Sequence, residues 1–267
     1  MTLTATGRLA AAFAGRSAQA PPGLIPYVTA GFPRRDDTAS LLLAAERAGC
    51  LGVEVGIHFS DPLADGPSIQ RSSQRALANG MTVDLALEQL NAARGAGLSL
   101  PVALMTCVNP VLSYGLERFC REAADCGADA VIVPDLPAGE SGELRAAADA
   151  TGLALILMVA PTTTAARLRT ACDLATGFIY CVSVTGTTGA RERIADGAFE
   201  LLDRVRALTP LPRALGFGLS RHEHLDQLRG RAEGAVVGAA LIDAVAARAH
   251  DPVGAAERFL VGMLGAG

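Results

Sequence analysis

Short apolar runs alternate with longer stretches of helical periodicity along most of the chain. Runs that are apolar at nearly every position indicate parallel strands buried on both faces, and the amphipathic stretches between them indicate crossover helices. The pattern predicts eight strands, at Leu24–Thr29, Gly52–Val55, Pro101–Thr106, Ala130–Val133, Ala154–Met158, Gly177–Val182, Arg213–Gly216 and Gly234–Val237.

A helix is expected after each strand, because a right-handed crossover must bring the chain back to start the next parallel strand. These helices are predicted at Thr38–Ala48, Val83–Ala93, Leu116–Cys126, Gly142–Ala150, Thr164–Cys172, Gly197–Leu208, Arg221–Arg229 and Leu241–Ala247. Two further helices, near Leu3–Phe13 and Pro252–Leu264, would be additions to the eight units.

Eight β/α units favour closure into an α/β fold of the (β/α)8 TIM barrel type, with an additional N-terminal helix and a C-terminal helix. The alternative is a doubly wound open sheet. The first βα turn, residues 29–37, lacks the Gly-x-Gly-x-x-Gly of dinucleotide-binding sheets, which weakens that alternative. No Gly/Ser-rich linker divides residues 1–267, so we expect one domain.

The composition allows a large core, since 50% of the residues are hydrophobic and 19% are charged. A net charge of −4 argues against nucleic acid and anionic membranes as partners. No apolar run approaches the roughly 20 residues that span a bilayer. We therefore expect a cytoplasmic protein.

All 23 basic residues are arginine. Schiff-base aldolases, covalent pyridoxal phosphate and P-loops require a lysine amine, so these chemistries are excluded. The six cysteines form no Cys-x-x-Cys pair, and we expect buried thiols and no metal site. The alternate spacing of His222, Glu223 and His224 at a predicted helix start favours a solvated face over a metal site.

Glu54 interrupts an apolar strand, and strand alternation directs it opposite to Val53 and Val55. We expect its carboxyl group to point into the barrel, where poor hydration would raise its pKa and suit it to give and take a proton. The alternative is a structural carboxylate paired with a buried Arg. Residues 58–70 follow as a long βα loop with Asp61 and Asp65, either of which could join an active site or simply form an Asx turn.

Two turns after the last strands, GFGLS at 216–220 and GAALI at 238–242, place small residues just before a helix. Loops after strands seven and eight are the usual phosphate position in such barrels, although glycine could also serve only tight turns. The segment Ser183–Ile194, with two glycines, resembles a lid that could close and exclude water; a surface loop without function is the alternative.

Several segments in order along the barrel resemble the tryptophan synthase alpha chain family: IPYVTAGFP, GVEVGIHFSDPLADGPSIQ, LMTCVNPVLSYG, VIVPDLP, FIYCVSVTGTTGAR, GFGLS and VVGAAL. The resemblance implies a cofactor-free lyase that cleaves indole-3-glycerol phosphate to indole and glyceraldehyde 3-phosphate, in tryptophan biosynthesis. It also implies a beta chain as partner in an alpha2beta2 tetramer. Releasing free indole alone, or mainly activating a beta-like subunit, are the alternatives.

The resemblance further implies site residues. Glu54 would be the acid and base, Asp65 would stabilise positive charge at the indole nitrogen, and Tyr180 would support Glu54. Thr188 would bond Asp65 on lid closure. The phosphate positions are Gly189, Gly218, Gly238 and Ala239, and the indole pocket positions are Tyr27, Ile69, Met105, Ile132, Phe217 and Val236.

Three residues depart from the family pattern. His58 replaces a usual Pro in a loop that normally meets the beta chain, and we favour a packing or interface role for it over a catalytic one. Cys107 replaces a usual Tyr near the pocket, which could alter the rate or the accepted ring. Ala239 replaces a usual Ser at the phosphate turn, where its backbone amide can still donate.

Overall fold

The computed structural model describes residues 5–16, 20–59, 65–183, 194–216 and 218–265. Within these residues, eight parallel strands close into a barrel in chain order. The strands are β1 (Gly23–Thr29), β2 (Val53–Gly56), β3 (Val102–Met105), β4 (Ala130–Ile132), β5 (Ala154–Val159), β6 (Ile179–Val182), β7 (Arg213–Gly216) and β8 (Gly234–Val237). Since β8 pairs with β1, the predicted TIM barrel is confirmed and the open sheet is excluded.

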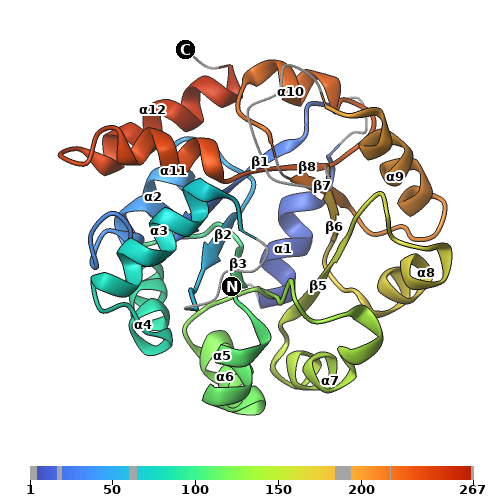
Figure 1. Cartoon of the computed structure of the whole chain (residues 1–267), viewed down its shortest axis with the longest axis horizontal. Helices are drawn as coiled ribbons and strands as arrows, with labels where there is room; N and C mark the ends of the chain where they lie inside the picture. Colours follow the sequence, from blue (N-terminus) through green and yellow to red (C-terminus); the bar gives the residue numbers. More distant parts are fainter. Residues whose placement is uncertain (1–4, 17–19, 60–64, 184–193, 217, 266–267) are drawn as a thin grey trace.

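Helices surround the barrel as a ring (Figure 1). They are α2 (Thr38–Arg47), α3 (Pro67–Ala78), α4 (Val83–Gly95), α5 (Val108–Tyr114), α6 (Leu116–Asp125), α7 (Gly142–Thr151), α8 (Ala165–Leu174), α9 (Asp196–Arg206), α10 (His222–Gln227), α11 (Ala239–Ala246) and α12 (Pro252–Leu264), with a 3-10 turn, η1 (Ala138–Glu140). In Figure 1 the helix α1 (Ala5–Phe13) instead lies inside the outline of the ring. Both predicted additional helices, α1 and α12, are present.

Strand alternation divides the core into two layers. Val53 and Val55 face the helices and belong to the large outer cluster. Residues whose side chains point to the other face of the strands, such as Ile132 and Val236, fill the barrel interior together with Leu9 of α1. This alternation directs the intervening Glu54 inward, as the sequence predicts.

The helices α3 and α5 were not predicted. The buried residues of α3 include Ser72 and Ser73. The helix therefore lacks the apolar stripe from which the other helices were predicted. The available signal was Pro67, because proline is favoured in the first turn of a helix. The helix α5 has seven residues and lies between β3 and α6, too short for a periodicity to develop.

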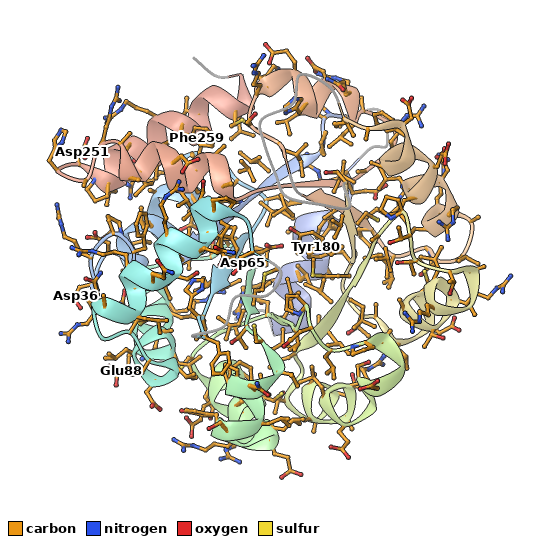
Figure 2. The ribbon with its side chains drawn as sticks, in the orientation of Figure 1. Asp36, Asp65, Glu88, Tyr180, Asp251 and Phe259 are labelled. Atoms are coloured by element: carbon orange, nitrogen blue, oxygen red, sulfur yellow. The ribbon has the colours of Figure 1, made fainter. Side chains whose placement is uncertain are left out.

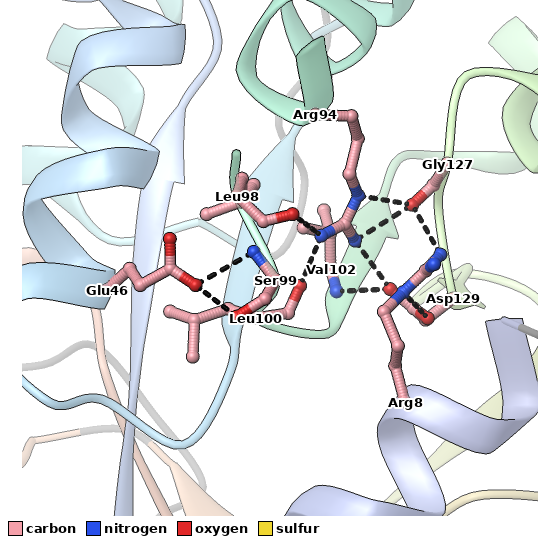
Figure 3. Close-up of polar contacts among 9 residues, drawn as sticks. All are labelled: Arg8, Glu46, Arg94, Leu98, Ser99, Leu100, Val102, Gly127 and Asp129. Carbon is pink, nitrogen blue, oxygen red and sulfur yellow. Dashed lines mark hydrogen bonds and ion pairs between the residues drawn. The ribbon is translucent and has the colours of Figure 1, made fainter. Parts of the chain in front are cut away.

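A buried ion network closes the barrel at the amino ends of the strands (Figure 3). Asp129, which directly precedes β4, is fully buried and accepts from Arg8 Nε and from Arg94 Nη2, each at 2.8 Å. Its Oδ2 also accepts the Val102 amide at 2.8 Å. Because Arg8 lies on α1, the network fixes that helix beneath the barrel, at the end opposite the carboxyl ends of the strands.

We expect Arg8→Ala to lower the free energy of unfolding by about 2 kcal/mol, the range for losing a hydrogen bond to a buried charged group. Arg94 remains to compensate the Asp129 carboxylate, so the chain should still fold. Urea unfolding measures the change, with Arg35→Ala as control, since Arg35 pairs only at the surface with Asp36. An unchanged midpoint for Arg8→Ala would contradict a stabilising role of the network.

Two expectations about polar and sulfur groups need correction. All six cysteines are free, but Cys107 and Cys126 are half-buried and only the other four are buried. His224 is 1% exposed and its Nδ1 accepts the Ser220 amide at 3.1 Å, so the solvated-face interpretation is wrong for this residue. Among the described helices, none combines the length and hydropathy of a transmembrane span.

Candidate active site

A cavity of about 300 Å³ opens at the carboxyl ends of the strands. Its walls come from β1, β2, β3, β6 and β8 and from the chain at the starts of α3 and α11. This is the end of a β/α barrel at which active sites form. Figure 2 places Asp65 and Tyr180 over the middle of the ring, whereas Asp36, Glu88 and Asp251 lie at its rim.

Glu54 lines this cavity from β2 and is fully buried. Neither carboxylate oxygen has a hydrogen-bond partner among the described residues. Burial raises the pKa of Glu54 to about 8. Among the described residues no Arg pairs with this carboxylate, as the structural alternative requires, and at neutral pH the group is an acid with a proton to give.

Asp65 lines the same cavity just before α3. Burial raises the pKa of Asp65 above its ordinary value of 3.8. Its backbone is fixed to the helix, because Gln70 Nε2 donates to the Asp65 carbonyl at 2.8 Å. Asp61, the other aspartate predicted for this loop, lies outside the described residues.

Two tyrosines frame Glu54 within the cavity. Tyr27 is the register partner of Glu54 on β1, and Tyr180 reaches the cavity from β6. Each hydroxyl lies against a glycine at a strand end, Gly56 for Tyr27 and Gly216 for Tyr180, where a Cβ atom would overlap it. Burial, and then the nearby Glu54, raise the pKa of Tyr180 well above its ordinary value. Burial also raises the pKa of Tyr27 well above its ordinary value, so both phenols are protonated at neutral pH.

The predicted indole wall is largely assembled. Ile69, Met105 and Val236 line the cavity together with Tyr27. Ile132 is fully buried in the barrel interior, where its register partner is Met105, but it does not border the cavity. Phe217 and Thr188 lie outside the described residues.

Three of the four predicted phosphate positions line the cavity, after the neighbouring strands β7 and β8. Gly218, Gly238 and Ala239 all line it, and Gly218 has a φ of 81°, a conformation that favours glycine. The N-cap of α11 is Gly238, which has no side chain to cap the helix, so the amides from Ala239 onward can donate to an anion. Gly189 and most of the predicted lid, residues 184–193, lie outside the described residues.

Several polar residues that line the cavity were not predicted. Ser220 and Asp243 line the cavity, and Ser68 Oγ donates to Asp243 Oδ2 at 2.9 Å. The Ser220 hydroxyl is buried and has no hydrogen-bond partner among the described residues. Ser220 could have been found, because it ends the GFGLS turn; Ser68 and Asp243 lie on helices whose packing the sequence does not specify.

Two of the three departures from the family pattern, Cys107 and His58, are half-buried and do not line the cavity. Cys107 precedes α5, and burial raises the pKa of its thiol to about 11, so the thiol is protonated at neutral pH. His58 lies two residues beyond β2, and its Nδ1 is 2.7 Å from Ser73 Oγ on α3.

The arrangement places a proton donor, a second carboxyl group and the backbone amides at the start of α11 around one cavity. Such a site can protonate an apolar ring, stabilise the resulting positive charge and hold a phosphate group at the helix amides. Among the described residues, no cluster of His, Cys, Asp and Glu could hold a metal ion.

Comparison with known proteins supports this description. The sequence model of the tryptophan synthase alpha chain matches residues 13–263. Tryptophan synthase alpha chains of Roseiflexus and Chloroflexus aggregans are similar at 46% identity over 238 residues and 45% over 220 residues, covering 89% and 82% of this chain and 91% and 82% of theirs. A chain from the tryptophan synthase a2b2 complex of Pyrococcus furiosus superposes with a TM-score of 0.86 at 38% identity, over 91% of this chain and 98% of that one.

Proposed function

This chain belongs to the tryptophan synthase alpha chain family, and we propose that Glu54 and Asp65 perform the family reaction in its barrel cavity. The chain is a carbon–carbon lyase that cleaves indole-3-glycerol phosphate to indole and glyceraldehyde 3-phosphate as the alpha subunit of tryptophan synthase. The observation on which the residue roles rest is the buried Glu54 carboxyl group, facing the same cavity as Asp65.

The proposed reaction moves one proton in a cycle. Glu54 gives its proton to the ring carbon that bears the side chain, and positive charge develops at the indole nitrogen, where the Asp65 carboxylate stabilises it. The neighbouring side-chain hydroxyl then gives its proton to Glu54. The carbon–carbon bond breaks, its electrons restore the aromatic ring, and an aldehyde forms. Glu54 ends protonated, so the step needs neither a lysine imine nor a metal.

The other assigned residues bind and orient the substrate in this proposal. Tyr180 supports the Glu54 carboxyl group, Ile69, Met105 and Val236 contact the indole ring, and the amides at Ala239 hold the phosphate group. The roles of Thr188, Gly189, Phe217 and Ile132 stay predictions. So do a cytoplasmic location and a single domain over residues 1–267.

The pH dependence tests the protonation states. A pKa raised to about 8 keeps Glu54 protonated up to that pH, so we expect kcat/KM to fall about tenfold per pH unit above it. Asp65 must be ionised, and its pKa lies above the ordinary 3.8, so the acid limb should lie above that value. Steady-state assays across pH measure both limbs. A kcat/KM that rises through pH 8 would show that the ionised form of Glu54 starts the reaction.

We expect this chain to act with a beta chain, because chains of similar structure belong to tryptophan synthase a2b2 complexes. The test is a steady-state assay with indole-3-glycerol phosphate, with and without a beta chain. Association and a faster cleavage rate on mixing would support the complex. An unchanged rate without association would instead favour a lyase that releases free indole alone.

A further inference from the structure

A half-buried imidazole links the two segments that hold the carboxyl groups. His58 extends from the end of β2, the strand of Glu54, and its Nδ1 lies 2.7 Å from Ser73 Oγ on α3. The helix α3 begins two residues after Asp65, at Pro67. The proposed mechanism uses neither His58 nor Ser73.

The direction of this hydrogen bond follows from the neighbouring contact. Ser73 Oγ also lies 2.7 Å from the Ile69 carbonyl, which can only accept, so the one serine hydrogen is donated there. His58 Nδ1 must therefore be the donor to Ser73. Burial lowers the pKa of His58 to about 4, so the ring is neutral near pH 7 and its single hydrogen lies on Nδ1. Within the described residues, nothing bonds the buried Nε2.

The helix α3 has a second anchor of the same kind. Ser72 Oγ donates to the Ile69 carbonyl at 2.8 Å and lies 2.7 Å from Thr29 Oγ1 at the end of β1. By the same reasoning Thr29 is the donor to Ser72. Thus β1 and the end of β2 each hold the first turns of α3 through one serine. These two contacts tie α3 to the carboxyl ends of β1 and β2, in addition to the bond from Ser68 to Asp243 on α11.

This geometry bears directly on Asp65. Its carbonyl is bonded by Gln70 of α3, so Asp65 moves with the helix. Glu54, in contrast, is held in the β2 ladder by its register partners on β1 and β3. The hydrogen bond between His58 and Ser73 therefore links the end of β2, the strand of Glu54, to α3, the helix to which Asp65 is bonded.

We propose that His58 is a positioning residue, whose hydrogen bond to Ser73 sets the place of Asp65 relative to Glu54. The inference rests on the roles proposed for these two carboxyl groups. A small misplacement of a catalytic group costs up to about a hundredfold in rate. Loss of this one anchor should cost less, about tenfold in kcat, with little change in KM because the ring and phosphate contacts remain.

The test compares five variants with indole-3-glycerol phosphate as substrate. His58→Ala and Ser73→Ala should each lower kcat about tenfold, and the double variant should fall no further, because both remove one contact. His58→Asn should recover most of kcat, because its amide can donate to Ser73 as Nδ1 does. His250→Ala, which removes an exposed imidazole, is the matched control and should keep the full rate.

Thermal unfolding of the same variants separates positioning from simple folding. A wild-type kcat in His58→Ala, multiplied losses in the double variant, or a loss that only follows the unfolded fraction would each overturn the inference. If Glu54→Gln and Asp65→Asn are inactive while His58→Ala is fully active, this inference alone fails. If either carboxyl variant is active, the proposed function fails instead.

Discussion

Glu54→Gln is expected to lower kcat for cleavage of indole-3-glycerol phosphate by at least about a hundredfold, the lower range for losing acid and base catalysis. The amide matches the carboxyl group in size but cannot deliver a proton to the ring carbon or accept one from the hydroxyl. Neither Glu54 oxygen has a hydrogen-bond partner in the described part of the chain, so the substitution breaks no contact there. Steady-state indole release measures the effect.

Glu88→Gln is the matched control, because Glu88 is exposed at the rim (Figure 2). Near-normal turnover by Glu54→Gln would refute the assigned role. The same variant examines the binding-partner alternative. This alternative would be favoured if the native chain cleaved no substrate and the Glu54→Gln variant still activated a beta chain fully. The main role of the chain would then be to activate a beta-like subunit.

The barrel and the direction of Glu54 could be predicted from the sequence because both depend on strand periodicity. Strands β7 and β8 have the predicted bounds, since each is a short apolar run with glycine at one end. Alternation along β2 directs Glu54 inward whatever its neighbours are. The raised pKa then follows, because a carboxyl group inside a barrel loses its water.

What could not be predicted depends on contacts between distant segments. The core-facing side of α3 is polar because Ser72 and Ser73 find their partners on β1 and after β2, and no local pattern reveals this. His224 is buried although it lies in a polar stretch, since its partner is the Ser220 amide in the preceding turn. Tyr27 was assigned to an apolar wall, yet its register with Glu54 brings a phenol to the reacting end.

Asp65→Asn should also lower kcat by at least about a hundredfold, but for an electrostatic reason. Asparagine keeps the shape and an acceptor oxygen, so a hydrogen bond at the indole nitrogen can persist while the negative charge is lost. The loss of a negative charge slows the reaction most at a site that excludes water. Asp36→Asn, at an exposed carboxylate, is the control and should leave the rate unchanged.

The pH profile of Asp65→Asn separates charge from shape. If the Asp65 carboxylate stabilises the positive ring, the acid limb of kcat/KM should disappear in the residual activity, while the alkaline limb near pH 8 set by Glu54 remains. The double variant with Glu54→Gln should be little slower than the slower single variant, because both groups act on one transition state. A normal rate in Asp65→Asn would mean that binding of the ring alone, without a counter-charge, suffices for cleavage.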